Sequence, residues 1–434
     1  FERFSQTGQG NVTYAGAFNF DTLGVAGGSV TVAAGQTLAS TGATTITGTD
    51  AAETVTNNGT IAGAVALGGG DDRFVNAGWV QGAVSLGDGN DSFVEGAGSR
   101  VAGGVDGGAG TNLYTALLSG DRTGLGQRSN FQQLAVTGTG TLSLTLDQNF
   151  DTVALAGTGL NVALAGNRIG AVTGTDAAEQ LRVDGDIASV SLGAGNDLLA
   201  LGTTNAAGRY DGGAGTDTLA FTANAPVVLS GLATGFENVS LTGNALTVAG
   251  LLGTQGAPLN FGDGDLSLTV AKGGTLAGVI DLGAGNDALR LAAGSVLLGT
   301  VAGGAGNDRA TLELAGNQTL AAGQLTGFET LATEGTGALT LTGVQAYNQV
   351  NAATDLTIAA GSSLTATQVA FTGGNQRFTI AGTFAGAVDG GAGTDSIALS
   401  AGTATAPVAF TNVANVEALA MTGGYATVSG NASF

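Results

Sequence analysis

Residues Asn76 to Glu95 read NAGWVQGAVSLGDGNDSFVE, in which a turn-like core, LGDGND, lies between two short apolar runs. The same arrangement recurs on both sides of this stretch. LGGGDD begins 19 residues before Leu86, at Leu67, and GGAGTN begins 21 residues after it, at Gly107. A period near 20 residues is too short for the common helical repeats and suits one coil of a parallel β-helix. We therefore predict that the protein is a stack of such coils.

Further copies of this turn fall into four clusters along the chain. Inside each cluster the step is 19 to 21 residues, and the peptide TGTDAAE stands about one step ahead of the first two clusters, at Thr47 and Thr173. At this step the 434 residues make about 20 coils of a three-sided solenoid. The turns begin at Leu67, Leu86 and Gly107, at Leu192 and Gly212, at Phe261, Leu282 and Gly303, and at Phe371 and Gly390.

Each coil reads as three short strands joined by glycine corners. Val84 and Leu86 alternate with small or polar residues, which is the period of a half-buried strand. Gly87 and Gly89 make the corner, because glycine adopts positive φ at little cost. No stretch has convincing helical periodicity, so the expected fold is all-β, a single-stranded parallel β-helix. The apolar residues that return after each turn, and that should stack from coil to coil, are Phe74, Phe93, Leu199, Leu219, Leu289 and Ile397.

A longer repeat is superimposed on the coils. FERFSQTGQG at the N-terminus resembles FQQLAVTGTG, FENVSLTGNA, FETLATEGTG and VEALAMTGGY further along. The copies span the whole chain, so we expect residues 1–434 to be one continuous β-helical fragment of a longer array. The acidic second position of this repeat carries Gln132 in one copy, which favours a structural role over a catalytic one. The copies begin near residues 1, 131, 236, 328 and 416.

Composition excludes several classes of function. The chain has 79 Gly, only 12 Lys plus Arg against 33 Asp plus Glu, and a net charge of -21. No basic surface is available for phosphates, so nucleic acid and anionic lipid are improbable partners. Without Cys or His, the chain cannot form disulfides, a Ser-His-Asp triad or a His-ligated metal site. No apolar run of about 18 residues predicts membrane insertion, and no signal peptide opens the sequence.

The turns are similar to the calcium-binding GGxGxD repeats of RTX proteins, as in DGGAGTDTL from Asp211 and DGGAGTDSI from Asp389. Bare carbonyls and carboxylates are the hard oxygen ligands that Ca²⁺ takes. Pairs on successive coils, 72/91, 197/217 and 287/308, would share an ion. The turns also depart from that family, because they do not run in tandem every nine residues and because Asn112 and Gln376 replace the Asp. The candidate calcium ligands are Asp72, Asp91, Asp197, Asp217, Asp287, Asp308 and Asp395.

Two alternatives to calcium binding stay open for these residues. Asp in a Gly-rich corner often caps its own backbone, which would give these residues a purely structural role. A glycan-active β-helix enzyme would need paired carboxylates, or Ca²⁺ with a basic residue, in one groove. Four Arg residues lie near the Asp turns in sequence, at 182, 209, 290 and 309, but nothing converges on a single place. Trp79 and the five Tyr residues are scattered, which favours packing over a sugar-binding face. We therefore expect no enzyme and no required cofactor.

The combination of FENVSLTG and GFETLATEGTG segments, NNGTIAGAVALG coils and DGGAGTDTL turns resembles passenger domains of alphaproteobacterial autotransporters, particularly the sphingomonad type. The resemblance covers essentially the whole chain. It implies a right-handed parallel β-helix that is exported through a C-terminal outer-membrane barrel, absent from this sequence, and displayed at the cell surface or secreted. The absence of Cys agrees with passage through such a pore.

Three functions follow as hypotheses from the residues and the resemblance. The first is a non-enzymatic, acidic, rod-like passenger that acts in adhesion or surface coating, with other cells, matrix, glycans or its own copies as partners. The second is a calcium-loaded, RTX-like surface-layer or secreted structural protein. The third, a β-helical glycan-active enzyme, has the least support, because the repeated motifs single out no unique constellation of residues.

Overall fold

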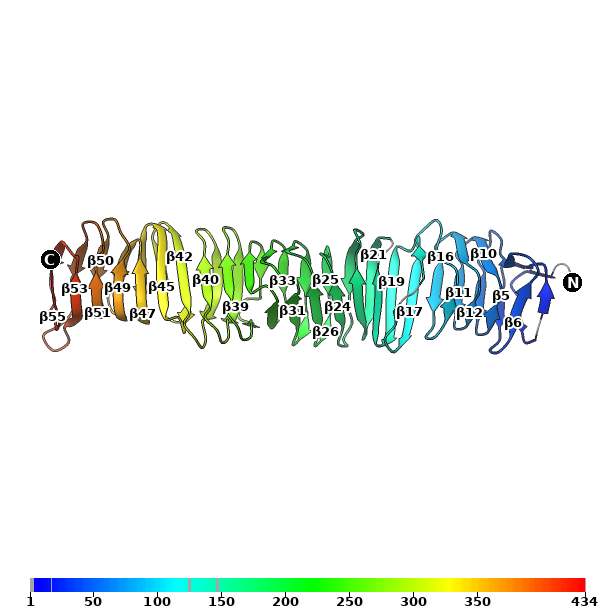
Figure 1. Ribbon diagram of the computed structural model, residues 1–434, viewed down its shortest axis with the longest axis horizontal. Helices are drawn as coiled ribbons and strands as arrows, with labels where there is room; N and C mark the ends of the chain where they lie inside the picture. The colour runs from blue at the N-terminus through cyan, green and yellow to red at the C-terminus, as the bar shows by residue number, and fades with distance from the viewer. Residues whose placement is uncertain (1–3, 17, 124–125, 146–147, 434) are drawn as a thin grey trace. The chain divides into compact units, whose positions relative to one another are not determined.

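The computed structural model describes residues 4–16, 18–123, 126–145 and 148–433. It confirms the predicted fold class, since the described residues contain no helix and the strands pair in parallel, as a β-solenoid of about 21 turns. The start of the first long repeat, at Phe1, lies outside these residues. By its contacts the chain divides into two compact units, one of residues 1–203 and 207–220 and one of residues 204–206 and 221–434. Figure 1 shows the strands of each unit succeeding one another coil by coil.

In the first unit, three strands follow one another in each early coil, as the sequence predicts. One wall is a seven-stranded parallel sheet and a second is a five-stranded one. The seven strands are β1 (Phe4–Thr7), β4 (Leu23–Ala26), β7 (Thr44–Thr47), β10 (Ala64–Gly69), β13 (Val84–Asp88), β16 (Val105–Asp106) and β18 (Arg128–Ser129). The five strands are β3 (Phe18–Phe20), β6 (Thr37–Ser40), β9 (Thr60–Ile61), β12 (Trp79–Val80) and β15 (Arg100–Val101).

The third wall of this unit extends through the later coils, which have two main strands each. It contains β2 (Asn11–Tyr14), β5 (Ser29–Val32), β8 (Thr54–Asn57), β11 (Arg73–Asn76), β14 (Ser92–Glu95), β17 (Leu113–Ser119), β19 (Gln133–Thr139), β21 (Phe150–Ala156), β23 (Ile169–Thr173), β25 (Ser189–Ser191) and β29 (Arg209–Asp211). The second main strands are β20 (Thr141–Thr145), β22 (Gly159–Ala163), β24 (Gln180–Val183), β27 (Leu198–Leu201) and β31 (Thr218–Phe221), and β26 (Ala194–Gly195) pairs with β30 (Ala214–Gly215) at the corner.

The second unit is built mainly on a twelve-stranded and a six-stranded parallel sheet. The twelve strands are β28 (Asn205–Ala206), β32 (Val227–Leu229), β35 (Ala245–Val248), β38 (Ser267–Val270), β40 (Ala288–Leu291), β42 (Arg309–Ala315), β45 (Thr330–Thr336), β47 (Val344–Ala352), β49 (Ser363–Phe371), β51 (Thr383–Asp389), β53 (Val408–Ala414) and β55 (Ala426–Val428). The six are β43 (Gln318–Ala321), β46 (Ala338–Thr342), β48 (Asp355–Ile358), β50 (Arg377–Ile380), β52 (Ser396–Leu399) and β54 (Ala418–Met421). Its other strands are β33 (Leu232–Thr234), β34 (Asn238–Leu241), β36 (Leu251–Leu252), β37 (Pro258–Asn260), β39 (Thr275–Asp281), β41 (Val296–Ala302) and β44 (Leu325–Thr326).

The prediction of three short strands in every coil is wrong for the later coils of the first unit, which have two main strands each, and for the last coils of the chain. There β47 and β49 run for 9 residues each, so one strand takes the place of two. The register between β49 and β51 shifts between Thr365 and Gln368, which is the mark of a β-bulge. A bulge bends the strand and increases its local twist without a glycine corner. One long bent strand therefore follows two walls of the coil.

The core consists of apolar ladders along the coil axis of each unit. Phe74 lies opposite Phe93, and Phe93 lies opposite Tyr114, with ring centroids 5.8 Å and 6.0 Å apart. In the second unit, Phe378 and Phe384 lie on different sheets, and their rings meet edge to face at 5.2 Å. Fully burying one such side chain stabilises the fold by about 1.5–3 kcal/mol. All predicted ladder residues are buried, namely Val80, Val84, Leu86 and Phe93 of the opening stretch and Phe74, Leu199, Leu219, Leu289 and Ile397 elsewhere.

Candidate functional site

The seven Asp residues predicted as calcium ligands share one position, the last residue of a glycine corner. Glycine is required there for two reasons. Gly87 has φ +113°, and a Cβ on it would lie 1.8 Å from the carbonyl oxygen of Gly68 on the preceding coil. The chain can therefore approach its neighbour closely and turn inward, which leaves each Asp at most 2 % exposed. The seven are Asp72, Asp91, Asp197, Asp217, Asp287, Asp308 and Asp395.

Each of these carboxylates bonds to the backbone of the preceding coil. The N–H of Asp72 donates to Oδ1 of Asp91 over 2.7 Å, and the N–H of Asp91 donates to Oδ1 of Asn112 over 2.8 Å. The same bond joins Asp197 to Asp217 and Asp287 to Asp308. The candidate pairs 72/91, 197/217 and 287/308 are therefore successive rungs of inward-facing ladders. The prediction that Asp caps its own backbone is wrong in this respect, because the bond crosses between coils.

A second ladder of hydrogen bonds runs beside the first, and its N–H groups donate in the opposite direction, toward the preceding coil. The residue before each buried Asp is exposed, and at most corners its own N–H donates to the side chain of the equivalent residue one coil earlier. Asn90 N–H bonds to Oδ1 of Asp71 over 2.8 Å, and Thr111 N–H bonds to Oδ1 of Asn90 over 3.0 Å. Of the two residues at such a corner, the buried one thus accepts an N–H from the preceding coil, and the exposed one accepts an N–H from the following coil. Because each polar side chain satisfies a backbone N–H of a neighbouring coil, the corner supplements the hydrogen bonds of the walls.

The acids of the longer repeats end these ladders, and the sequence analysis did not include them in the site. Oε2 of Glu329 accepts the N–H of Asp308 over 2.7 Å, and Oε2 of Glu417 accepts that of Asp395 over 2.6 Å. In the first ladder Oε1 of Gln132 accepts the N–H of Asn112. A carboxylate and an amide oxygen accept this bond equally well, which explains why Glu and Gln alternate there. The sequence signal was available, since each acceptor lies one coil step beyond the last corner residue.

The TGTDAAE peptides begin two ladders, and their Glu residues are a second group that was missed. Glu53 N–H donates to Oδ1 of Asp72, and Glu179 N–H donates to Oδ1 of Asp197, both over 2.7 Å. Oε1 of Glu53 accepts the N–H of Gly27 and the hydroxyl of Thr49. Oε1 of Glu179 accepts the equivalent bonds, from Gly157 and Thr175. These peptides are therefore the first rungs of their ladders.

The second carboxylate oxygen of most rungs is buried without a hydrogen-bond partner among the described residues. The rungs with such an Oδ2 are Asp72, Asp91, Asp197, Asp287, Asp308 and Asp395. Burial disfavours the charged form. It raises the pKa of Asp72 to about 7 and that of Asp197 to about 6, and neighbouring carboxylates add to the increase. Burial also raises the pKa of Asp91, Asp287 and Asp395.

Two natural amide rungs show what lies in front of that oxygen. Nδ2 of Asn112 donates to the carbonyl oxygens of Gly108 and Asn130, and Nε2 of Gln376 donates to that of Gly373. In the third ladder, a Cβ on Gly303 would lie 2.5 Å from Gly327 O and 2.8 Å from Oδ2 of Asp308, so the same geometry recurs. A carboxylate oxygen that faces a carbonyl needs either a proton or a cation between them.

The corner is a sparse donor set for calcium. Ca²⁺ takes about 6–8 oxygen ligands. Each rung has one carboxylate oxygen already bonded to a backbone N–H and offers only the other, together with nearby carbonyls. Within the described ranges, no three His, Cys, Asp or Glu side chains are grouped as a metal site would require. A proton satisfies the same oxygens with a single O–H donor, and we therefore favour the protonated carboxyl.

A buried ion cluster in the first unit escaped the sequence analysis. Glu95 is 1 % exposed, and Arg128 contacts both of its carboxylate oxygens, at 3.0 Å and 2.9 Å. Arg122 and the Tyr114 hydroxyl also bond to Glu95. The Arg128 guanidinium lies 5.8 Å from the centroid of the Phe93 ring. The carboxylate is therefore fully paired, as a buried charge must be.

The scattered aromatic residues do not form one face. Tyr114, Tyr210 and Tyr347 are buried in the core, whereas Trp79 is 41 % exposed on β12. The guanidinium of Arg100, one coil later, lies 5.8 Å from the centroid of the Trp79 ring. Of the Arg residues near the corners, Arg290 forms surface ion pairs with Glu313 and Glu334.

Comparison with known proteins adds no family to this picture. A scan against protein-family models finds no match for the chain, and a search of curated proteins finds none either. In the described part of the chain, no helix has the length and apolar character needed to cross a membrane. The fold class, a parallel β-solenoid with internal side-chain ladders, is thus the basis for the proposals that follow.

Proposed function

We propose that this chain is a non-enzymatic scaffold, a structural or adhesive passenger displayed at a cell surface or secreted. The observation that carries the proposal is the use of the repeated acids. The Asp at the last position of each corner is buried, and its carboxylate bonds to the backbone of the preceding coil, as Asp91 does to Asp72. The repeated chemistry therefore holds coils together, which supports a structural role for these acids over a catalytic one.

The resemblance to sphingomonad-type autotransporter passengers supports surface display. The absence of Cys suits export through a narrow pore, and a net charge of -21 keeps such a surface soluble and repels anionic neighbours. Antibodies raised against the chain should label intact cells of its source, and external protease should remove the label. A label that appears only after lysis would refute surface display.

Adhesion is tested separately from localisation. Beads coated with the chain, and albumin-coated control beads, are incubated with matrix proteins, a glycan panel, the source's own cells and chain-coated beads. The proposal expects retention on at least one of these surfaces, without release of glycan fragments. Retention no higher than that of albumin on every surface counts against adhesion. Release of reducing ends from any glycan would assign an enzyme instead.

A second candidate function, calcium binding, is favoured by one observation. Oδ2 of Asp72, Asp91 and other rungs is buried and has no hydrogen-bond partner among the described residues, and a divalent ion would neutralise such oxygens. Titration calorimetry with Ca²⁺ near pH 8 distinguishes this candidate from a scaffold whose rungs bind protons and no metal. Saturable uptake that is lost in Asp91→Asn would support calcium sites. The scaffold without metal sites predicts no saturable uptake.

A further inference from the structure

The coil stack of the second unit has a discontinuity between β41 and β43. Strand β41 pairs with β39 along its whole length, but with β44 only at Val301 and Ala302. Its first five residues, 296–300, therefore have no strand on the next coil within the described chain. In that coil β43 begins a new sheet, in which it is the terminal strand and pairs with β46 alone. Two free strand edges thus border the same gap.

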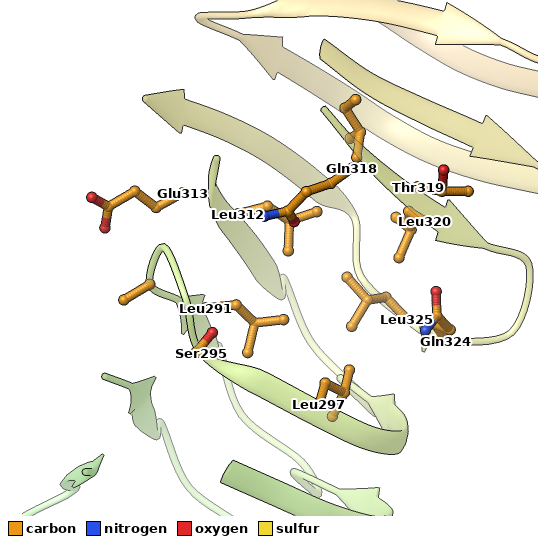
Figure 2. A pocket seen from close by; sticks show the side chains of 12 residues that line it. Leu291, Ser295, Leu297, Leu312, Glu313, Gln318, Thr319, Leu320, Gln324 and Leu325 are labelled. Atoms are coloured by element: carbon orange, nitrogen blue, oxygen red, sulfur yellow. The ribbon is translucent and has the colours of Figure 1, made fainter. Parts of the chain in front are cut away.

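A cavity of about 130 Å³, lined by both leucine and polar side chains, lies at this discontinuity (Figure 2). Leu312, Leu320, Leu325 and Leu339 form its buried wall. Leu291 and Leu297 also line it and are only half-buried. Their ladder partners one coil earlier, Val270 and Leu276, are 0 % exposed. The internal ladder therefore opens to the outside at this cavity. Leu291 still has Leu312 as its partner on the next coil, but Leu297 has no strand partner there within the described chain.

The free edge of β43 has hydrogen-bonding groups available. In a parallel strand, successive N–H groups point to opposite neighbours. Ala322 N–H bonds to Thr342 O on the β46 side, and Ala321 N–H points the other way, to Oε1 of Gln324 at 2.7 Å. By the same alternation, Thr319 N–H faces the free edge. The N–H of Gln324 also donates to the carbonyl oxygen of Ala321 over 3.2 Å, so Gln324 takes the place of a missing strand at both edge-facing groups of Ala321. Thr319 is left as the residue that faces a partner strand, and β43 carries no charge or proline that would block pairing.

We propose that this discontinuity is a docking site for an extended peptide strand from a partner protein. The strand pairs with the free edge of β43 and places one aliphatic side chain in the cavity, the mode known as β-augmentation. A cavity of about 150 Å³ holds one benzene molecule, so the space here fits a single Leu or Ile side chain. Glu313 lines the cavity, and with Glu334 and the paired Arg290 it gives the rim one net negative charge. Basic residues beside the aliphatic one complement this rim.

The probe is a synthetic, fluorescently labelled peptide of sequence Lys-Thr-Lys-Thr-Leu-Thr-Lys-Thr, followed by fluorescence polarisation. We expect saturable binding. Replacing Leu by Ser removes the buried side chain, and N-methylating the amides beside Leu removes the edge bonds. Each change should weaken binding by about tenfold or more. An affinity that is insensitive to both changes would show charge attraction alone and would overturn the proposal.

Two neighbouring residues of β41 provide a matched pair of variants. Leu297→Phe fills the cavity and should abolish binding. Leu298→Phe changes the next side chain, which is 41 % exposed and does not line the cavity, and should leave binding intact. Circular dichroism and melting confirm that both variants fold. Equal binding by both variants contradicts the proposal. Self-association of the chain that Leu297→Phe abolishes, without peptide binding, would also contradict it and assign the site to a second copy.

Discussion

The backbone N–H of Asp72 donates to Oδ1 of Asp91, 19 residues later, over 2.7 Å. This bond, repeated from corner to corner, explains why the motif needs an acceptor at its last position and why Asn112 can also occupy it. The first role of the acid is therefore structural, because it joins one coil to the preceding one. Its second oxygen, which has no hydrogen-bond partner among the described residues at six of the rungs, is where protonation or a metal ion would act.

Asp91→Ala should destabilise the chain much more than Asp91→Asn. Alanine leaves the buried N–H of Asp72 without an acceptor, at a cost of about 1–3 kcal/mol. Asparagine keeps the acceptor, as Asn112 does on the next rung. Urea unfolding of both variants and the parent chain measures the difference. If Asn is as damaging as Ala, the bond between coils is not what the position provides.

Stability should fall as pH rises from about 4 to about 7. Burial raises the folded-state pKa of Asp72 to about 7 and that of Asp197 to about 6, above the unfolded value of about 3.9. Between those limits the folded chain binds more protons than the unfolded chain, so rising pH favours unfolding. Urea midpoints at pH 5 and pH 8 measure the effect.

General repulsion in this acidic chain also weakens stability as pH rises, and a variant separates the two causes. Asp72→Asn together with Asp197→Asn removes two titrating rungs with little change in net charge. The double variant should have a smaller difference between pH 5 and pH 8 than the parent chain. An unchanged difference would assign the pH dependence to overall charge rather than to the ladders.

Gly87→Ala should be far more damaging than Gly98→Ala. Both glycines have positive φ, +113° and +77°, so alanine is strained at either position. The strain alone costs about 1–2 kcal/mol. At Gly98 nothing lies within 4 Å of the new Cβ, whereas at Gly87 the carbonyl oxygen of Gly68 lies 1.8 Å away. Melting temperatures give the comparison, and similar losses at the two sites would contradict close coil contact at the corner.

Arg128→Ala should cost about 3–5 kcal/mol, because it removes a partner of the buried Glu95 carboxylate. Arg290→Ala is the matched surface control. Its two ion pairs, with Glu313 and Glu334, are more than one-third exposed and should contribute at most about 1 kcal/mol. Urea unfolding compares the two variants. Losses of equal size would mean that Arg128 acts through its stacking or through its aliphatic stem rather than by neutralising Glu95.

The periodic part of the structure was predictable from sequence. A fixed step with Gly at the corner and an apolar residue two places after Asp is enough to place Phe93 in the core and Asp91 at the turn. The direction of the Asp91 bond was not predictable, because spacing does not tell whether a side chain caps its own turn or the coil before. Asn112 was interpreted as a departure from a calcium motif, although its Oδ1 fills the same rung. Gln376 departs in part, because its N–H donates to Asp395 but its Oε1 has no hydrogen-bond partner among the described residues.

Structural features outside the repeat could not be predicted from the sequence pattern. Glu95 bonds to Arg122 and Arg128, 27 and 33 residues away, and neither separation is a whole number of coils. The cavity beside β43 could not be predicted from the sequence either, because the step from Asp287 to Asp308 and on to Glu329 stays at 21 residues across the discontinuity. The coil there changes its path between corners without changing its length.

The most direct test of the central claim, that the Asp ladders are structural rungs that bind protons and not calcium, is thermal unfolding near pH 8 in added Ca²⁺ and in EGTA. The account predicts the same melting temperature in both, and a higher one when the pH is lowered to about 5. A fall of many degrees on chelation, abolished by Asp91→Asn and Asp72→Asn, would contradict the claim and establish the corners as calcium sites.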